Sequence, residues 1–454
     1  MGVWQRRPAL VVSVGAHRAG SFVNAATSPR SMVKILSRRF FDLGFRALRK
    51  AMRAFRGSPK ARTLRVFPPT RDRLELGDLV NRLAWYVPNP ATRIQVPCAP
   101  AVLAESANLS SLAVPRGQSR QFEKLPENVA LVPARRVPEP EADLILLRRW
   151  RSLWRVALDL NRVAMIDAEF YSTEESTTWA TLHDSGLSAQ ERSDLESASK
   201  GNFANLLESL AGAKRAYVFT TGPSLDRATS FTYEPSSLRI VCNSIVKNRS
   251  LLEYIRPQVL VFADPVFHFS PCVYANEFRR HALEMIRQHD CYCMVPETQA
   301  SLLLAHYPGL GGRLIGMPVW PARVWNFPTT QRFFVAETAN IMTLFMLPLA
   351  STVAREVYVI GADGRQKGET YFWRHSAQNQ FDELMQTVVE THPSFFRDRV
   401  YTDYYAEHCR VVASQIAFGE ARGCTYNSLT PSYIPALAAR HVPDGEGEAA
   451  CGLA

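Results

Sequence analysis

Beyond residue 214 the sequence alternates short apolar runs with longer stretches of helical periodicity. Short apolar strands separated by helices are typical of a mostly parallel, twisted sheet with helices on both faces. The runs that predict strands are Ala216–Thr220, Leu238–Cys242, Val259–Ala263, Cys291–Val295, Arg313–Met317 and Val357–Gly361. The stretches that predict helices are Val273–His289, Glu297–His306, Thr338–Leu349, Gln378–Thr391 and Thr402–Ala421. An α/β domain is therefore expected over residues 214–438.

The rest of the chain has a different texture, and 454 residues are too many for one compact domain. Ser188 and Glu191 form a capping-box pattern that predicts the start of a helix. A start of the protein at Met32 instead of Met1 is an open alternative. The segments expected before and after the α/β domain are a weakly structured extension (1–31), a basic amphipathic helix (32–62), a Pro-rich connector (63–145), a helical region (146–213) and a tail (439–454).

Residues 32–56 combine an apolar stripe with a strong positive charge. The formal charge of the chain is +11, and between Lys34 and Arg62 the single acid is Asp42. A basic amphipathic helix with aromatic residues on its apolar face is typical of attachment to an anionic membrane surface. Docking of the stripe on the protein's own core, or a disordered arm, are the alternatives. The stripe consists of Leu36, Phe40, Leu43, Ala47, Ala51 and Phe55.

Cysteine usage and apolar run lengths indicate the compartment. The eight cysteines show neither CxxC pairs nor the spacing of zinc ligands, which favours buried thiols in a reducing compartment. No apolar run reaches the ~18–20 residues that a membrane-spanning helix needs. We therefore expect a cytoplasmic protein, peripheral on the inner face of the membrane where residues 32–56 bind lipid.

Polar and small residues follow several of the predicted strands. Ligands of parallel sheets bind at the carboxyl ends of the strands, near a topological switch point, so these residues predict a nucleotide pocket in a Rossmann-like fold. A glycine lets a ligand approach the backbone, a helix start binds anions, and amide or carboxylate groups suit a sugar or a base. For each position alone, an ordinary strand-ending turn is the alternative. The candidate binding residues are Thr221, Gly222, Pro223, Ser224, Asn243, Asp264, Thr338, Ala339, Gly361 and Asp363.

The set GPSL, CNS, ADP and G-A-D-x-x-x-x-G-x-x-Y resembles the family 42 glycosyltransferases, the bacterial sialyltransferases of the Campylobacter lipooligosaccharide type. The resemblance spans residues 214–437, about half of the chain. Its most specific piece is GADGRQKGETYFW, in which Tyr371 follows Asp363 at the family's spacing. Thr221 and Asp264 stand where the family has asparagines, and Ala339 stands where it has a serine.

The resemblance implies a GT-A-like α/β fold with a flexible lid. The reaction would transfer a sugar from a CMP-activated donor such as CMP-sialic acid to a glycan hydroxyl, with inversion, without a metal and without a further cofactor. His392 would be the catalytic base, with His375 and His408 as rivals, and Tyr371 and Arg365 would stabilise the leaving phosphate. The acceptor would be a glycan or a lipid-linked glycan, and a homo-oligomer is compatible with this assignment.

Two other functions remain open. The archaeal-type pterin pyrophosphokinases of the MptE-like group also carry a GPSL turn and a later aspartate. In that case Asp264 and Asp363 would hold Mg²⁺ for ATP. A non-catalytic basic protein that binds nucleic acid is compatible with the charge. The sequence disfavours it, because the positive excess is concentrated in a segment with an apolar stripe.

Overall fold

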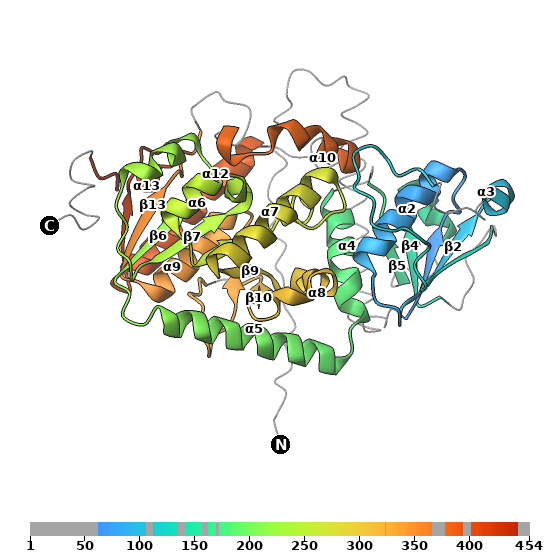
Figure 1. Cartoon of the computed structure of the whole chain (residues 1–454), viewed down its shortest axis with the longest axis horizontal. Helices are drawn as coiled ribbons and strands as arrows, with labels where there is room; N and C mark the ends of the chain where they lie inside the picture. Colours follow the sequence, from blue (N-terminus) through green and yellow to red (C-terminus); the bar gives the residue numbers. More distant parts are fainter. Residues whose placement is uncertain are drawn as a thin grey trace.

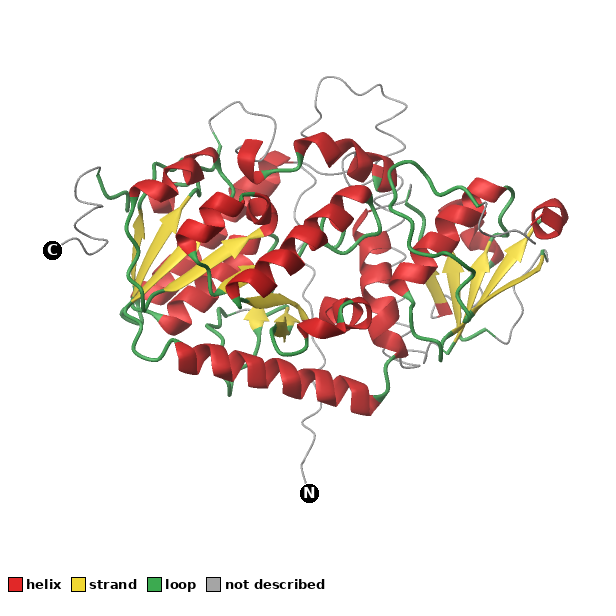
Figure 2. Cartoon of the chain, viewed as in Figure 1, coloured by secondary structure: helices red, strands yellow, loops and turns green. Residues whose placement is uncertain are grey.

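The computed structural model describes residues 62–105, 112–134, 142–156, 162–168, 172–322, 324–365, 377–393 and 401–443. Within these ranges the chain forms two parallel β-sheets with helices packed against them, plus a small parallel pair (Figures 1 and 2). The expected α/β class with mostly parallel sheets is therefore confirmed. The extension, the basic amphipathic segment 32–56, Tyr371 and His375 lie outside the described residues.

The larger sheet has the strand order β10-β9-β8-β7-β6-β13-β14, and every neighbouring pair is parallel. Six of its strands lie where the apolar runs predict them, within one or two residues. The edge strand β14 was not predicted, because its sequence Thr-Tyr-Asn-Ser has no apolar run. The bounds are β6 Arg215–Phe219, β7 Leu238–Cys242, β8 Val259–Val261, β9 Tyr292–Pro296, β10 Leu314–Met317, β13 Glu356–Ile360 and β14 Thr425–Ser428.

Helices cover this sheet, and the predicted capping box opens one of them. Ser188 Oγ accepts from the amide of Glu191, and the Glu191 carboxylate accepts from the amide of Ser188, which fixes the start of α5. The bounds of the other helices around the sheet are α6 Arg249–Ile255, α7 Val273–His289, α8 Glu297–His306, α9 Leu347–Val353, α10 Met385–Thr391, α12 Tyr401–Glu420 and α13 Pro435–Ala438, and those of α5 are Ala189–Ser209.

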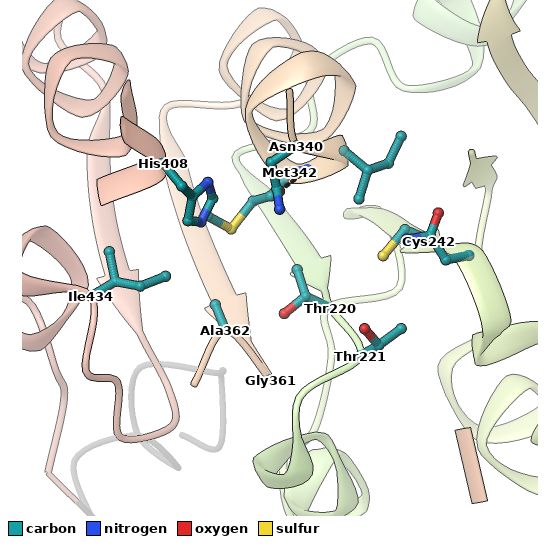
Figure 3. Close-up of a pocket in the computed structure, with 11 residues that line it drawn as sticks. Thr220, Thr221, Cys242, Asn340, Met342, Gly361, Ala362, His408 and Ile434 are labelled. Carbon is teal, nitrogen blue, oxygen red and sulfur yellow. Dashed lines mark hydrogen bonds between the residues drawn. The ribbon is translucent and has the colours of Figure 1, made fainter. Parts of the chain in front are cut away.

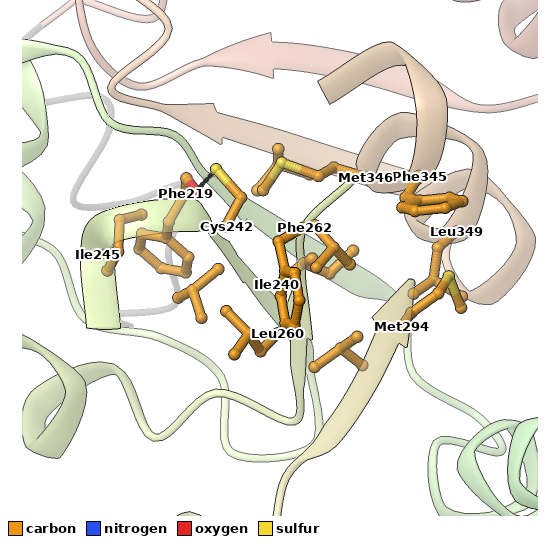
Figure 4. Packing of buried hydrophobic residues seen from close by; sticks show 14 of the residues in the cluster. Phe219, Ile240, Cys242, Ile245, Leu260, Phe262, Met294, Phe345, Met346 and Leu349 are labelled. Carbon is orange, nitrogen blue, oxygen red and sulfur yellow. Dashed lines mark hydrogen bonds between the residues drawn. The ribbon is translucent and has the colours of Figure 1, made fainter. Parts of the chain in front are cut away.

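The core of the sheet is continuous with the helix that precedes β13. Ile240, Leu260 and Met294 are fully buried on adjacent strands, and Phe345 and Leu349 from the helical segment share their cluster (Figure 4). Burial of such side chains contributes about 1.5–3 kcal/mol each relative to exposure. This packing fixes the position of the chain that enters the helical segment, and therefore one wall of the site described below.

Two predicted helices differ from their expected bounds. Regular helix does not begin at Thr338 but at Ile341, because the side chain of Asn340 accepts from the amide of Met342 and caps the segment there. A π-helical turn, Met342–Met346, precedes α9, and Pro348 lacks the amide that a regular turn would use. The second difference concerns Gln378–Thr391, where two short 3₁₀ turns, Ala377–Asn379 and Asp382–Leu384, precede α10.

Residues 63–145 are not a Pro-rich connector, which corrects the expectation from sequence. They contain three strands and the start of a fourth in the smaller parallel sheet, whose order is β3-β2-β1-β4-β5, and they contribute most of a second buried core. Some prolines follow strands, as Pro68 does directly after β1, and others such as Pro97 lie within a strand. The expected helical region 146–213 does contain helices, together with β5. The bounds are β1 Thr63–Phe67, α2 Arg73–Tyr86, β2 Arg93–Cys98, α3 Pro100–Glu105, β3 Val129–Pro133, β4 Leu144–Leu147, β5 Val163–Met165 and α4 Ser172–Gly186.

Each sheet has one topological switch point. In the smaller sheet the chain adds β2 and β3 on one side of β1 and then β4 and β5 on the other, so the strand order reverses between β1 and β4. In the larger sheet β7 to β10 extend from one side of β6, and β13 and β14 lie on the other. Open parallel sheets bind ligands outside the carboxyl ends of the strands at such points. The neighbours β6 and β13 therefore define the place to look for a site.

The two sheets are joined by a junction of buried side chains. The indole of Trp85 on α2 stacks on the imidazole of His306 at the end of α8, with 4.0 Å between ring centroids and 9° between planes. The guanidinium of Arg279 lies 4.0 Å from the centroid of Trp85 on α2. Arg82 Nη2 donates to the carbonyl of Thr391 at 2.9 Å. Figure 1 shows α4, α7 and α8 between the two sheets.

Candidate functional site

The turns that follow β6 and β13 are held together by two glycines. The amide of Gly222 donates to the carbonyl of Gly361 at 2.9 Å. Gly361 has φ +78°, and a Cβ on Gly222 would lie 2.1 Å from Asp363 Oδ2 and 2.3 Å from the carbonyl oxygen of Gly361. Because real Cβ atoms do not approach other atoms so closely, both turns require glycine here. The glycine of the GPSL motif thus serves the close packing of two turns.

Asp363 adds further contacts between the turns after β6 and β13. We call the contacts of Gly222 with Gly361 and of Ser224 with Asp363 the clasp. Its carboxylate accepts from the amide of Ser224 at 3.2 Å and from Ser224 Oγ at 2.9 Å. Burial raises the pKa of Asp363, and the hydrogen bonds from Ser224 oppose that rise. Pro223 occupies the first position of the 3₁₀ segment Pro223–Ser230 that follows the turn. The two motifs that carry the resemblance therefore meet, but the carboxylate faces the GPSL turn.

Asn243 is the most unusual residue at this edge. It follows β7 with φ +49°, in the left-handed region that a residue with a side chain adopts at a cost. Its side-chain oxygen is buried and has no hydrogen-bond partner among the described residues. A buried acceptor left unbonded costs roughly 1–3 kcal/mol. Strain and an unused acceptor at one residue indicate a position shaped for a ligand.

Asn243 lines a cavity at the strand ends, which we call the strand-end cavity. Figure 3 shows this cavity with Thr220, Asn340 and His408 labelled in its wall. Its volume of about 10 Å³ is that of a single water. It is bounded by the ends of β6, β7 and β13, by the start of the π-helical segment and by α12. The lining residues are Thr220, Thr221, Cys242, Asn243, Asn340, Ile341, Met342, Gly361, Ala362, His408 and Ile434.

A larger pocket, the helix pocket, lies beside the strand-end cavity and shares Asn340 and His408 with it. Its volume is about 490 Å³, within the range of small-molecule sites. The predicted residues Thr338 and Ala339 belong to it. The hydroxyl of Tyr404 donates to the carbonyl of Ala339 and so ties α12 to this wall. The other lining residues are Ala322, Trp325, Glu337, Thr343, Glu407, Arg410, Val411 and Ser414.

His408 lies on α12 between the two spaces. Its side chain is 4% exposed, and burial lowers the pKa of its imidazole to about 4. At neutral pH the ring is therefore uncharged and able to accept a proton. An anion bound next to it would raise this pKa by favouring the charged form.

His392, the base implied by the resemblance, lines neither space. It is buried at the carboxyl end of α10, where its amide donates to the carbonyl of Val388. The preceding residue Thr391 bonds Gly117 and Arg82, which belong to the part of the chain around the smaller sheet. The structure thus places His392 at the junction between the sheets and His408 at the strand ends.

The carboxylate of Asp264 is hydrogen-bonded within its own turn. Its Oδ1 accepts from the amides of Val266 and Phe267 at 2.9 and 3.0 Å, which closes the turn after β8. It lines neither the strand-end cavity nor the helix pocket. The alternative interpretation of Asp264, an ordinary turn, accounts for these contacts.

Arg365 lies on the turn after β13 and packs against Tyr405 of α12. Its guanidinium lies 5.1 Å from the ring centroid of Tyr405, and its amide donates to the Tyr405 hydroxyl at 3.2 Å. Its Nη1 is buried and has no hydrogen-bond partner among the described residues. Burial raises the pKa of Tyr405 to about 12, so this phenol keeps its proton at neutral pH. A buried donor on a permanent cation suits a phosphate oxygen.

The carboxylates expected for Mg²⁺ under the pyrophosphokinase alternative do not form a common site. Asp363 is bonded to Ser224 and Asp264 to its own turn. Across the described ranges, no three His, Cys, Asp or Glu side chains converge as metal ligands would.

Several residues of the site were not predicted from sequence. Asn340 follows the predicted pair Thr338-Ala339, and its preference for helix starts was the available signal. Tyr404 and Trp325 carry no sequence signal, since their place depends on the packing of α12. His408 was named as a rival base, and its spacing to the apolar positions of the last helix gave no reason to prefer it.

No protein-family model matches the sequence, and searches of curated proteins and of solved structures give no match either. In the described part of the chain, no helix has the length and apolarity needed to cross a membrane.

Proposed function

We propose that this protein is a glycosyltransferase that takes a sugar from a CMP-activated donor and transfers it to a glycan hydroxyl. The observation that carries the proposal is Asn243, strained and with an unbonded buried acceptor, at the switch-point edge of the larger sheet. Around it lie two polar threonines, Thr220 and Thr221, and the start of a helical segment at Asn340. This is the position at which open parallel sheets bind nucleotides.

In this proposal the nucleotide lies at the strand ends. The amide group of Asn243 hydrogen-bonds the base or the ribose, since it both donates and accepts. The helical start at Asn340–Met342 and the guanidinium of Arg365 attract the phosphate. A departing CMP carries negative charge, and donors already aimed at that place stabilise it without reorganisation.

His408 is the base in this proposal, in place of His392. It lines both spaces, so it can contact the donor in one and an acceptor hydroxyl in the other. The anionic donor raises its pKa from about 4 toward the working pH, which improves proton transfer from the acceptor. The helix pocket, with Trp325 and Tyr404 in its wall, has room for the acceptor sugar.

A cavity of about 10 Å³ is smaller than a nucleotide. Binding therefore requires displacement of the segment that closes it, and the irregular residues Thr338–Asn340 before the helical segment are the ones to move. In this structure Ala339 is exposed and Thr338 Oγ1 is held by Thr343 Oγ1 at 3.0 Å. A shift here merges the strand-end cavity with the helix pocket.

The first test is calorimetric binding of CMP, CDP, UDP, GDP and ATP to the full chain, with and without Mg²⁺. We expect CMP to bind without Mg²⁺ and Asn243→Ala to weaken it roughly tenfold, the effect of one lost hydrogen bond. Asn205→Ala, which changes an exposed asparagine on α5, is the matched control. Failure of CMP to bind would overturn the proposal, and Mg²⁺-dependent ATP binding would favour the pyrophosphokinase.

The second test separates the two histidines. Loss of a general base lowers turnover roughly 10²–10⁴-fold. We expect this loss for His408→Gln, measured as CMP release from a CMP-sugar with an acceptor at saturating donor concentration. His392→Gln should keep its turnover within a few-fold. The opposite pattern would return the role of base to His392.

A further inference from the structure

The most exposed large apolar side chains in the described ranges include a pair at one edge of the smaller sheet. Trp154 is 73% exposed and Leu74 is 53% exposed. They follow β4 and β1, which are hydrogen-bonded neighbours, so both lie near the carboxyl edge of the sheet. The two segments are tied together, because Glu75 beside Leu74 pairs with Arg149. We call the surface around Trp154 and Leu74 the Trp154 patch.

The fold itself turns Trp154 outward. It lies in the 3₁₀ segment Trp150–Arg155, whose neighbouring Leu153 is buried in a cluster with Phe67 and Leu147. Leu153 therefore anchors the segment to the sheet, and the indole of Trp154 projects into solvent. Nothing in the core requires an aromatic residue at this position.

The patch is strongly basic. The segment after β4 reads RRWRSLWR, with four arginines and no acid, and Arg71 adds a further charge before α2. Arg155 lies 5.0 Å from the centroid of the Trp154 ring, and Arg151 lies 5.8 Å from that of Trp150. Neither Arg151 nor Arg155 pairs with a carboxylate in the described part of the chain. Arg148 and Arg149 pair with Glu75, so the positive charge of the patch comes mainly from Arg151 and Arg155.

Charge limits what can cover this surface. The basic segment between Lys34 and Arg62 would bring like charge to it, and so would the same patch of a second copy related by a twofold axis. An anionic partner is favoured instead. Of such partners, a phospholipid surface uses both kinds of side chain, since tryptophan and leucine enter the interface and arginine pairs with headgroups. A nucleic acid would use the arginines but would gain nothing from Leu74.

We propose that the Trp154 patch contacts an anionic phospholipid surface. This contact is separate from the one expected for residues 32–56, and it stands independently of the proposed transferase activity. Phosphate groups of the lipid accept from Arg71, Arg151 and Arg155, and the rings and chains of Trp154 and Leu74 lie among the upper acyl carbons.

The binding test uses the full chain with vesicles of phosphatidylcholine containing roughly 30% phosphatidylserine, a composition chosen to give a clear negative surface potential. We expect the double variant Arg151→Glu, Arg155→Glu to bind at least about tenfold more weakly, with added salt weakening the wild type in the same way. Arg287→Glu, Arg422→Glu changes net charge equally on the other part of the chain and should bind as the wild type does. Equal binding of all three proteins would overturn the proposal.

A second measurement reports on Trp154 directly, so that binding through residues 32–56 does not hide it. Vesicles with brominated acyl chains quench indoles that enter the interface. Trp154→Phe should lose a large share of the quenching, and Trp320→Phe, which removes an indole 46% exposed elsewhere, should lose none. Unchanged quenching in Trp154→Phe would overturn the proposal. So would a double variant that loses binding to a single-stranded oligonucleotide, or changes its oligomeric state, while it keeps binding to vesicles.

Discussion

The two parallel sheets share a topology with one reversal of strand order, but they differ in the side-chain contacts at the switch-point edge. At the switch point of the larger sheet, Gly222 and Gly361 pack closely and Asn243 presents an unbonded acceptor to a cavity. At that of the smaller sheet, Arg148 and Arg149 after β4 both pair with Glu75 on α2. The edge of the larger sheet keeps one buried acceptor unbonded among the described residues, whereas the charged groups of the smaller sheet's edge pair with one another.

The same topology therefore gives both sheets an edge where a ligand could bind, and the side chains at each edge determine whether that edge is open. A parallel sheet with a strand-order reversal always has a crevice edge. In the smaller sheet this edge is bridged by ion pairs, and its surplus arginines face outward around Trp154. A nucleotide is therefore proposed for the larger sheet and a charged surface for the smaller one.

The largest expected effect comes from breaking the junction that joins the two sheets. Trp85→Ala removes the stack on His306 and the contact with Arg279, and it leaves a large buried void. We expect a loss of about 4 kcal/mol in the free energy of unfolding. Hydrogen exchange in increasing urea should then show β1 and β2 opening before β6 and β13. Trp154→Ala, an exposed indole, should change stability by less than about 0.5 kcal/mol, and simultaneous opening of both sheets in Trp85→Ala would contradict the assigned role of the junction.

The next effect concerns the clasp of the larger sheet alone. In Gly222→Ala the new methyl group meets a backbone carbonyl and the Asp363 carboxylate, neither of which can move freely. We expect a loss of about 3 kcal/mol, measured by urea unfolding. Gly201→Ala is the control, since Gly201 lies inside α5 with open space around it. That variant should gain up to about 1 kcal/mol from helix propensity. A neutral Gly222→Ala would show that the two turns are not tightly coupled.

A smaller effect distinguishes the junction from the site by its pH dependence. Burial lowers the pKa of His306 to about 4, against about 6.5 for an exposed histidine. The contribution of His306 is fully present above pH 6.5. It is lost as the pH falls toward 4, because only the unfolded chain then takes up the proton. His306→Phe keeps a ring against Trp85, and its stability should fall between pH 7 and pH 5 by about 2 kcal/mol less than that of the wild type. If the wild type and His306→Phe lose the same stability between pH 7 and pH 5, a group other than His306 causes this pH dependence.

Much of the larger sheet followed from the sequence, because its strands are compact apolar runs bounded by polar turns. The smaller sheet did not, since prolines such as Pro68 and Pro97 within and beside its strands suggested a loose connector. The edge strand β14 was also missed, because Tyr426 is its single large apolar residue.

The candidate site was predictable in its location but not in its internal partners. Thr221, Asn243 and Gly361 meet at one cavity, as expected for strand ends of a parallel sheet. Whether Asp363 faces a ligand or Ser224 depends on two turns that are far apart in the chain. Likewise, the choice between His408 and His392 depends on how α12 and α10 pack, which no local pattern encodes.

The stack of Trp85 on His306 limits how far the two sheets can move relative to one another. Many two-lobed enzymes capture their substrate by swinging the lobes about a flexible hinge. Here the parts of the chain around the two sheets are held together by the stacked rings of Trp85 and His306, by the guanidinium of Arg279 and by the hydrogen bond from Arg82 to Thr391. Wholesale lobe rotation would have to break all of these contacts at once. Under the proposed function, a ligand would enter the strand-end cavity through local shifts of short loops, so the rate of its binding should be set by loop motion and not by separation of the two sheets.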